Sequence, residues 1–138
     1  MRILVVDGEE EVQRIRENLE PRGFEVRGTA SGEDALHLWE NEGPWDLVLT
    51  ELWITPGKNI RSGLELAKAI RAISPSQQIA IHTCDQGLLA APVPVFHKPC
   101  RIEHLLQMLR APIRPLIGLT RERKMRADNS VDTDVLLT

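Results

Sequence analysis

Short apolar runs alternate with amphipathic helical patterns along residues 1–110, and this alternation constrains the fold more than any other feature. Helical periodicity follows each of the first three runs and returns at residues 102–109. Strands separated by helices require right-handed crossovers and a parallel sheet covered on both faces. The sequence therefore predicts an α/β fold with a five-stranded parallel sheet. The expected strands are residues 2–7, 24–29, 45–50, 79–83 and 93–97.

Local signals predict where the helices begin and end. Ser31 with Asp34 three positions later predicts the start of one helix, and Ser62 with Glu65 has the spacing of a capping box before another. Gly23 follows the first helical stretch. It predicts the end of that helix, because glycine readily adopts the left-handed backbone conformation that terminates many helices.

Composition places the chain among ordinary globular proteins. Its 138 residues are 42% hydrophobic, with a formal net charge of -3, and they suffice for one domain with a buried core. We expect this domain at residues 1–110 and a tail at residues 111–138. The weakly acidic balance disfavours a nucleic-acid surface. No apolar run reaches membrane-spanning length, no secretory signal precedes the first strand, and the two cysteines have no framework spacing, so we expect a cytoplasmic protein.

Four polar residues lie at the carboxyl ends of predicted strands: Asp7, Glu51, Thr83 and Lys98. In doubly wound sheets, ligands bind at this edge, beside the topological switch point. We therefore expect the four side chains to share one site. Two carboxylates, a hydroxyl and an amine are the parts of a site that binds a phosphoryl group.

The order of several short sequences resembles the receiver domain of two-component response regulators. These sequences are R-I-L-V-V-D, L-E-P-R-G-F-E-V, S-G-E-D-A-L, W-D-L-V-L-T-E-L, S-G-L-E-L and H-K-P, in the family's order over residues 1–110. The resemblance implies a flavodoxin-like, doubly wound sheet with strand order 2-1-3-4-5. It also implies a signalling module rather than an enzyme, which accepts a phosphoryl group from a histidine kinase onto an Asp with the help of Mg²⁺.

The resemblance assigns roles to individual residues. Asp7 matches the first member of the family's acidic pair, whereas Gly8 stands in place of the second member, a direct metal ligand. Glu51 stands in place of the acceptor Asp. Thr83 and Lys98 match the residues that contact phosphoryl oxygens. Asp7 and Glu51 are the metal ligands that remain, and we expect a Mg²⁺ site that is weak or lost, because this hard cation needs several oxygen ligands.

Other departures from the family pattern surround the site. Glu9 could supply part of the acidic pocket, although strand alternation points it elsewhere. Val95 stands in place of the aromatic residue that many receivers use for switching. The loop over residues 51–63 is longer than the family's and of the size of an Ω-loop. The stretch over residues 83–98 is shorter and contains two prolines, so we expect the fourth helix of the fold to be shortened or absent.

Glu51 has three interpretations. Its carboxylate extends about 1 Å further than that of Asp, and misplacement of that size can cost roughly 100-fold in rate. The longer side chain could instead reach Lys98 and form an ion pair where the phosphoryl group would otherwise sit. Such a pair would either mimic the phosphorylated state or be a structural salt bridge without switching. Phosphoryl acceptance by Glu51 is the third interpretation.

We predict a degenerate receiver that acts through protein–protein interaction, with a histidine kinase or another signalling protein as partner and a homodimer left open. The main alternative is a working phospho-acceptor. A small flavodoxin-like hydrolase would need a nucleophile beside a general base. A DNA-binding regulator would have to act through the tail. Nothing in the sequence predicts contact with a membrane.

Several residues outside this site have weaker interpretations. Asp46 is better explained as the start of a strand than as an alternative acceptor. His82, Cys84, His97 and Cys100 could hold zinc, and the two cysteines could form a redox pair. Their spacing matches no zinc-finger pattern, however, and buried free cysteines are the simpler explanation.

The tail carries a basic cluster at residues 121–126 and ends in an apolar V-L-L-T sequence. A solvated segment explains the cluster most simply. Docking of the tail on a partner, on a second copy or on the body is the next interpretation, and the apolar end suggests that something binds it. Nucleic-acid contact is the least favoured, since one short cluster is a poor footprint.

Overall fold

The computed structural model describes residues 1–87 and 91–110, and these contain the predicted five-stranded parallel sheet. The strand order is β2-β1-β3-β4-β5, as the family resemblance implied. All four strand pairs are parallel. The strands are β1 (Arg2–Val6), β2 (Glu25–Thr29), β3 (Leu47–Thr50), β4 (Ile79–Thr83) and β5 (Val95–His97).

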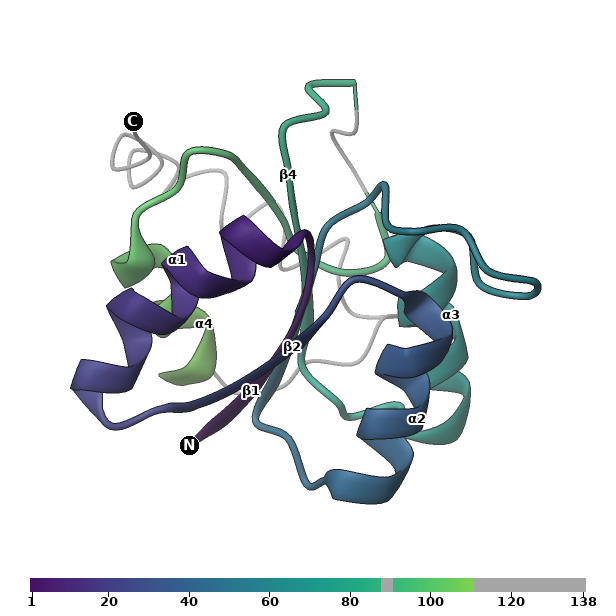
Figure 1. Ribbon diagram of the computed structural model, residues 1–138, viewed down its shortest axis with the longest axis horizontal. Helices are drawn as coiled ribbons and strands as arrows, with labels where there is room; N and C mark the ends of the chain where they lie inside the picture. Colours follow the sequence, from purple (N-terminus) through teal and green to yellow (C-terminus); the bar gives the residue numbers. More distant parts are fainter. Residues whose placement is uncertain (88–90, 111–138) are drawn as a thin grey trace, which may run out of the picture.

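Helices cover both faces of the sheet, with α1 and α4 on one side and α2 and α3 on the other (Figure 1). Each layer has its own cluster of buried apolar residues. Leu4, Val48 and Ile81 face the layer of α2 and α3, whereas Ile3, Leu49 and Ala80 face the layer of α1 and α4. The helices are α1 (Glu9–Leu19), the 3-10 turn η1 (Glu20–Arg22), α2 (Gly32–Glu42), α3 (Gly63–Ile73) and α4 (Ile102–Arg110).

The predicted helix signals are confirmed, with one difference. The Ser31 hydroxyl accepts the N–H of Asp34, and the Ser62 hydroxyl accepts the N–H of Glu65 at 3.2 Å. In a reciprocal capping box, the Glu65 carboxylate would accept the N–H of Ser62. Here it accepts the N–H of Arg61 at 2.7 Å, one residue earlier. Gly23 has a φ of 93° and ends η1 directly after α1, as predicted.

Three strands begin later than predicted, at residues 25, 47 and 95 instead of 24, 45 and 93. Trp45 is buried, but its indole N–H donates to the carbonyl of Leu38 on α2, so it packs before the strand begins. Pro94 has no N–H to give to a sheet, although its carbonyl accepts the N–H of Ile81 at 2.8 Å. The apolar runs therefore extend beyond the residues that pair.

The connection from β4 to β5 contains no helix in its described residues, 84–87 and 91–94. This agrees with the prediction that the fold's fourth helix is shortened or absent. The helix labelled α4 is thus the one predicted from the periodicity of residues 102–109. The predictions for the tail fall on residues 111–138, outside the described residues, and the domain boundary at residue 110 stays a prediction.

The long connection from β3 to α3 is packed against the body rather than free of it. Leu52, Ile54 and Ile60 are buried in the cluster under α2 and α3. The N–H of Thr55 donates to the carbonyl of Ala30 at 3.0 Å, directly before α2. The loop that follows β3 is therefore held by a backbone hydrogen bond against the segment before α2.

Across the described parts of the chain, every helix is too short or too polar to cross a membrane.

Candidate functional site

Backbone hydrogen bonds align the carboxyl ends of the strands, so the four polar residues predicted from the sequence come together. The N–H of Glu51 donates to the carbonyl of Val6 at 2.8 Å, which sets the end of β3 beside the end of β1. The N–H of Lys98 donates to the carbonyl of Thr83 at 2.8 Å, which does the same for β5 and β4. Asp7 follows β1 directly.

Lys98 bridges the two carboxylates of the site. Its Nζ lies 2.8 Å from Oδ2 of Asp7 and 3.0 Å from Oε1 of Glu51. The three side chains are only 11–15% exposed. The ion pair between Glu51 and Lys98 that the sequence suggested is therefore confirmed, and Asp7 is a second partner of the same ammonium.

The Glu51 carboxylate receives several donors. Its Oε2 accepts the N–H of Leu52 at 2.6 Å and that of Trp53 at 3.4 Å. Burial raises the pKa of Glu51, but hydrogen bonds from the Thr83 hydroxyl and from Lys98 outweigh it, so the pKa is lowered. The group is thus held as an anion by an ammonium, a hydroxyl and backbone N–H groups.

Lys98 responds to the same arrangement in the opposite sense. Burial lowers its pKa, but its hydrogen bonds and charge interactions with Asp7 and Glu51 outweigh burial and raise it. The ammonium therefore stays protonated in the pocket. The site holds two negative charges and one positive charge in a space where water has little access.

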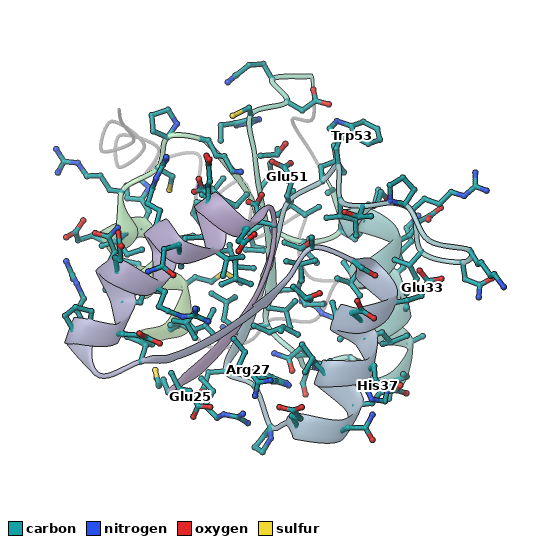
Figure 2. All side chains as sticks on the ribbon, viewed as in Figure 1. Glu25, Arg27, Glu33, His37, Glu51 and Trp53 are labelled. Carbon is teal, nitrogen blue, oxygen red and sulfur yellow. The ribbon has the colours of Figure 1, made fainter. Side chains whose placement is uncertain are left out.

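Trp53 and Asp85 extend the site outward, and neither was predicted from the sequence. The Trp53 indole N–H donates to Oδ2 of Asp85 at 2.9 Å, and the Asp85 N–H donates to Oγ1 of Thr83 at 3.1 Å. Together with the bonds to Glu51, these contacts close a ring through both loops. Figure 2 shows Trp53 above Glu51 at this edge of the molecule, and Trp53 is 67% exposed.

One sequence signal could have revealed this ring. Trp53 stands two positions after Glu51, and Asp85 stands two positions after Thr83. Since β3 and β4 are adjacent and parallel, the residues that directly follow them lie in neighbouring loops at the same edge of the sheet.

Gly63 is a further residue whose importance the sequence did not reveal. A Cβ at this position would lie 2.2 Å from the Glu51 carbonyl oxygen. The N–H of Gly63 also donates to the carbonyl of Leu52 at 2.7 Å. Glycine thus lets the start of α3 approach the end of β3 closely.

Gly8 and Glu9 do not add a carboxylate to the cluster. Gly8 caps α1, and its N–H donates to Oδ1 of Asp7 at 2.7 Å. Glu9 begins α1 with an exposed side chain, and among the described residues it makes no hydrogen bond or ion pair with Asp7, Glu51 or Lys98. Glu9, which was predicted to belong to the acidic pocket, therefore does not contact the other charged residues of the cluster directly.

Two carboxylates, those of Asp7 and Glu51, meet at the place predicted for a metal ion. Within residues 1–87 and 91–110, no group of three or more His, Cys, Asp or Glu side chains is arranged to hold one. The carboxylates of Asp7 and Glu51 each accept a hydrogen bond from the Lys98 ammonium. The zinc site considered for His82, Cys84, His97 and Cys100 is likewise not formed, because these four described residues include no group of three or more arranged to hold a metal ion.

The cysteines differ from the simplest expectation. Both are free thiols, but Cys84 is exposed, so the interpretation that both are buried is wrong for Cys84. Cys100 is partly buried, and burial raises the pKa of its thiol to about 11. Neither forms a disulfide in this structure.

His82 is buried beside the site without a hydrogen-bond partner. It is 5% exposed, and neither ring nitrogen has a partner. Burial lowers its pKa to about 4, and the positive charges of Lys98 and Arg14 contribute, although the negative charge of Glu51 opposes them. His82 is therefore neutral and is not part of the hydrogen-bonded cluster.

The remaining candidates lie where the simpler interpretations put them. Asp46 precedes β3 at the opposite end from Glu51, and its carboxylate accepts the N–H of Arg2 at 2.6 Å. Val95 is half-buried and packs on the apolar cluster under α2 and α3.

The sequence over residues 3–110 matches the family described as the response regulator receiver domain. The chain belongs to this family of two-component signalling modules. It is similar to the response regulator protein TrrA of Thermotoga maritima, solved in complex with Mg²⁺–BeF, at 30% identity over 79% of this chain and 96% of that one, with a TM-score of 0.63.

Two further solved structures are similar. A receiver domain protein of Clostridium thermocellum is 25% identical over 90% of this chain and 98% of that one, with a TM-score of 0.65. TrrA in complex with the histidine kinase ThkA is 28% identical over 79% and 95% of the two chains, with a TM-score of 0.62. No curated protein matches the chain.

Proposed function

We propose that this chain is a degenerate receiver, in which the Glu51 carboxylate occupies the place of a phosphoryl group and signalling proceeds by binding to other proteins. The observation that carries the proposal is the double contact of Lys98, at 2.8 Å to Asp7 and 3.0 Å to Glu51. The family resemblance gives this lysine, with Thr83, the task of contacting phosphoryl oxygens. Here both residues serve the carboxylate of Glu51.

The donors around Glu51 support a permanent anion. An ammonium, a hydroxyl and the N–H groups of Leu52 and Trp53 surround one carboxylate. Charge-assisted hydrogen bonds of this kind are the strong ones, and together they match what an incoming phosphoryl group would need. A phosphoryl group on Glu51 would have to displace the carboxylate's own bonds first, so the site favours the unmodified anion.

The metal half of the site supports the same conclusion. Oδ2 of Asp7 is bonded to Lys98, and Oδ1 accepts the N–H of Gly8 at 2.7 Å. Mg²⁺ demands near-octahedral oxygen coordination, and the lysine ammonium at this point repels a divalent cation. The residues therefore do not fit a Mg²⁺ ion well, and we propose that binding is weak or lost.

The proposed partner is a histidine kinase or another signalling protein, in the cytoplasm. The similarity to TrrA, which is found in complex with the kinase ThkA, supports the class of partner. A site that holds its own anion would present one fixed surface to such a partner, rather than a surface that changes on phosphorylation.

The test restores the missing parts in pairs. The wild type and the variant Gly8→Asp with Glu51→Asp are incubated with Mg²⁺ and acetyl phosphate, and intact mass is measured. Position 8 has room for the new side chain, because a Cβ there meets nothing within 4 Å. We expect no phosphoryl adduct on the wild type and an adduct on the double variant.

The matched control is Gly8→Asn with Glu51→Asp, which has the same shape at position 8 without the charge. It should accept far less phosphate than the variant that carries Gly8→Asp, because it lacks the metal-binding carboxylate. A stable adduct on the wild type, with Mg²⁺-dependent NMR shifts at Glu51 and Thr83, would instead establish a working phospho-acceptor and refute the degenerate receiver.

A further inference from the structure

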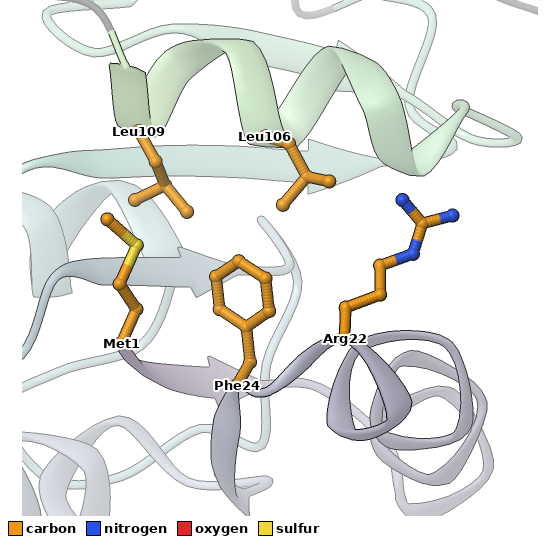
Figure 3. Close-up of a pocket in the computed structure, with 5 residues that line it drawn as sticks. All are labelled: Met1, Arg22, Phe24, Leu106 and Leu109. Carbon is orange, nitrogen blue, oxygen red and sulfur yellow. The ribbon is translucent and has the colours of Figure 1, made fainter.

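An open apolar groove lies at the edge of the sheet opposite to the Glu51 site. It has a volume of about 340 Å³ and is lined by Met1, Phe24, Leu106 and Leu109, with Arg22 at one end (Figure 3). The start of β1 and the residues before β2 form one wall, and α4 forms the other. The groove plays no part in the Glu51 site, which lies at the carboxyl ends of the strands.

The groove combines apolar walls with one positive group. Met1 is 60% exposed, and Phe24 and Leu109 are only partly buried. The Arg22 side chain is 45% exposed, and the contact of its guanidinium with Glu103 is long, at 3.4 Å. A guanidinium has five N–H donors, so Arg22 keeps donors for a second carboxylate. The groove thus fits an apolar segment that carries negative charge.

The chain itself contains one segment with this chemistry. Residues 131–138 read V-D-T-D-V-L-L-T, with two carboxylates directly before three apolar side chains. The other apolar stretch after α4, L-I-G-L at residues 116–119, follows Arg114 and has no acid beside it. Charge complementarity with Arg22 therefore favours residues 131–138.

The covalent connection makes this occupant accessible. Leu109, which lines the groove, is 22 positions before Val131. A stretch of 22 residues can span at most about 75 Å, so the length of the chain allows residues 131–138 to reach the groove. Tethering also gives an effective concentration of about a millimolar, so weak contacts suffice for occupancy.

We propose that residues 131–138 bind in this groove of the same molecule, with Val135, Leu136 and Leu137 against its apolar walls and with Asp132 and Asp134 toward Arg22. This inference does not depend on the state of the Glu51 site. In this proposal, residues 131–138 bind to their own molecule rather than to a partner protein or to nucleic acid.

The experiment uses the full chain labelled with ¹⁵N. Amide chemical shifts of Phe24, Leu106 and Leu109 are compared between the wild type and the variant Leu136→Ser with Leu137→Ser. We expect shifts at these groove residues and none at Glu51 or Thr83. The matched control, Leu116→Ser with Ile117→Ser, removes the same number of apolar side chains from the other stretch and should leave the groove shifts unchanged.

Adding a synthetic peptide of residues 129–138 to the Leu136→Ser, Leu137→Ser variant should return the groove shifts toward wild-type values. The same peptide with Asp132→Asn and Asp134→Asn should need at least a several-fold higher concentration. Three results would overturn the proposal: groove shifts in the control variant only, no groove shift in either variant, or wild-type groove shifts that depend on protein concentration, which would place a second copy in the groove.

Discussion

Lys98 and His82 are two basic side chains at the ends of neighbouring strands, and they respond to burial in opposite ways. Lys98 has two carboxylate partners, and its pKa is raised although burial opposes this. His82 has no hydrogen-bond partner on either ring nitrogen, and burial lowers its pKa to about 4. Partners therefore decide whether a basic group in this part of the molecule is charged, and burial alone does not.

Strand alternation explains why the two residues differ. His82 is two positions after Ala80, which packs in the layer of α1 and α4, so it faces an apolar surrounding. Lys98 follows β5 and its ammonium lies at the carboxyl edge of the sheet, where Asp7 and Glu51 directly follow β1 and β3. Lys98 thus belongs to a charged cluster at the edge of the sheet, whereas His82 is a neutral residue on the sheet face that α1 and α4 cover.

The largest expected effect comes from removing the charged partner. Lys98→Met leaves the Asp7 and Glu51 carboxylates facing each other without a cation. Removing one partner of a buried ion pair typically costs about 3–5 kcal/mol. We therefore expect the free energy of unfolding, measured by urea denaturation at pH 7, to fall by about 4 kcal/mol. The control is Lys68→Met on α3, an exposed lysine, which should change stability by about 0.5 kcal/mol at most. Equal losses in both variants would contradict the role of Lys98.

The next effect is the dependence of stability on pH that His82 confers. Its pKa is about 4 in the folded protein against 6.5 ordinarily, so the unfolded chain binds the proton more readily between these values. The contribution of neutral His82 to the free energy of unfolding is therefore fully present above pH 6.5, and stability falls by on the order of 3 kcal/mol as pH drops toward 4. Urea unfolding across this range measures the loss.

His82→Leu should flatten the stability curve between pH 6.5 and 4, since the buried group no longer takes up a proton. The control His37→Leu replaces an exposed histidine on α2 and should leave the slope as in the wild type. An unchanged slope in His82→Leu would show that another group titrates in this window.

A smaller effect is expected when the charge of Glu51 is removed and its shape is kept. Glu51→Gln leaves Lys98 with Asp7 as partner, so the loss should be about 2 kcal/mol, the size of a hydrogen bond to a charged group. The pKa of Glu51 is lowered from 4.5, so its contribution is present above pH 4.5 and is lost as pH falls below it. Thermal unfolding at pH 7 and pH 3 should therefore show a larger difference between Glu51→Gln and the wild type at pH 7 than at pH 3.

Glu25→Gln is the control for this substitution, because Glu25 forms an ion pair with Arg2 at the surface and is 56% exposed. We expect a change below about 1 kcal/mol there. A larger loss in Glu25→Gln than in Glu51→Gln would contradict the view that the Glu51 carboxylate is a principal partner of Lys98.

The smallest expected effect lies at the outer end of the hydrogen-bonded ring. Asp85→Ala removes the acceptor of the Trp53 indole, which is already largely exposed. The unfolding midpoint should stay within error, while acrylamide quenching of fluorescence should increase. Trp45 is buried and the Trp39 indole N–H donates to Gln77, so Trp53 should be the main tryptophan to respond. Quenching that is unchanged in Asp85→Ala, but altered in Gln86→Ala beside it, would contradict the ring.

Much of the fold followed from local patterns, and the exceptions have physical causes. The five strands, their order and the starts of α2 and α3 agree with the predictions from periodicity, capping residues and family resemblance. Strand boundaries were less accurate, because Trp45 and Pro94 have apolar side chains but lie before the strands that follow them. Apolar character predicts burial, whereas the strand boundary also depends on the local backbone: Pro94 has no N–H to donate to a neighbouring strand.

The site was predicted in part. Asp7, Glu51, Thr83 and Lys98 were grouped because polar residues at parallel strand ends share one edge, and the ion pair of Glu51 with Lys98 followed from side-chain length. Their functional roles stay predictions. Trp53 and Asp85 were missed because their bond crosses between two loops of irregular backbone, and the burial of His82 without a partner has no signal in the sequence around it.

By itself the sequence determined the class of fold and the residues at the edge of the sheet, because periodicity and strand ends depend on neighbours close in the chain. Only the tertiary structure decided that one ammonium serves two carboxylates, that Gly63 brings α3 against the Glu51 carbonyl, and that His82 is left neutral. Each of these depends on distances between segments far apart in the chain. Such distances are set when the layers pack, and the charge of a buried group depends on them.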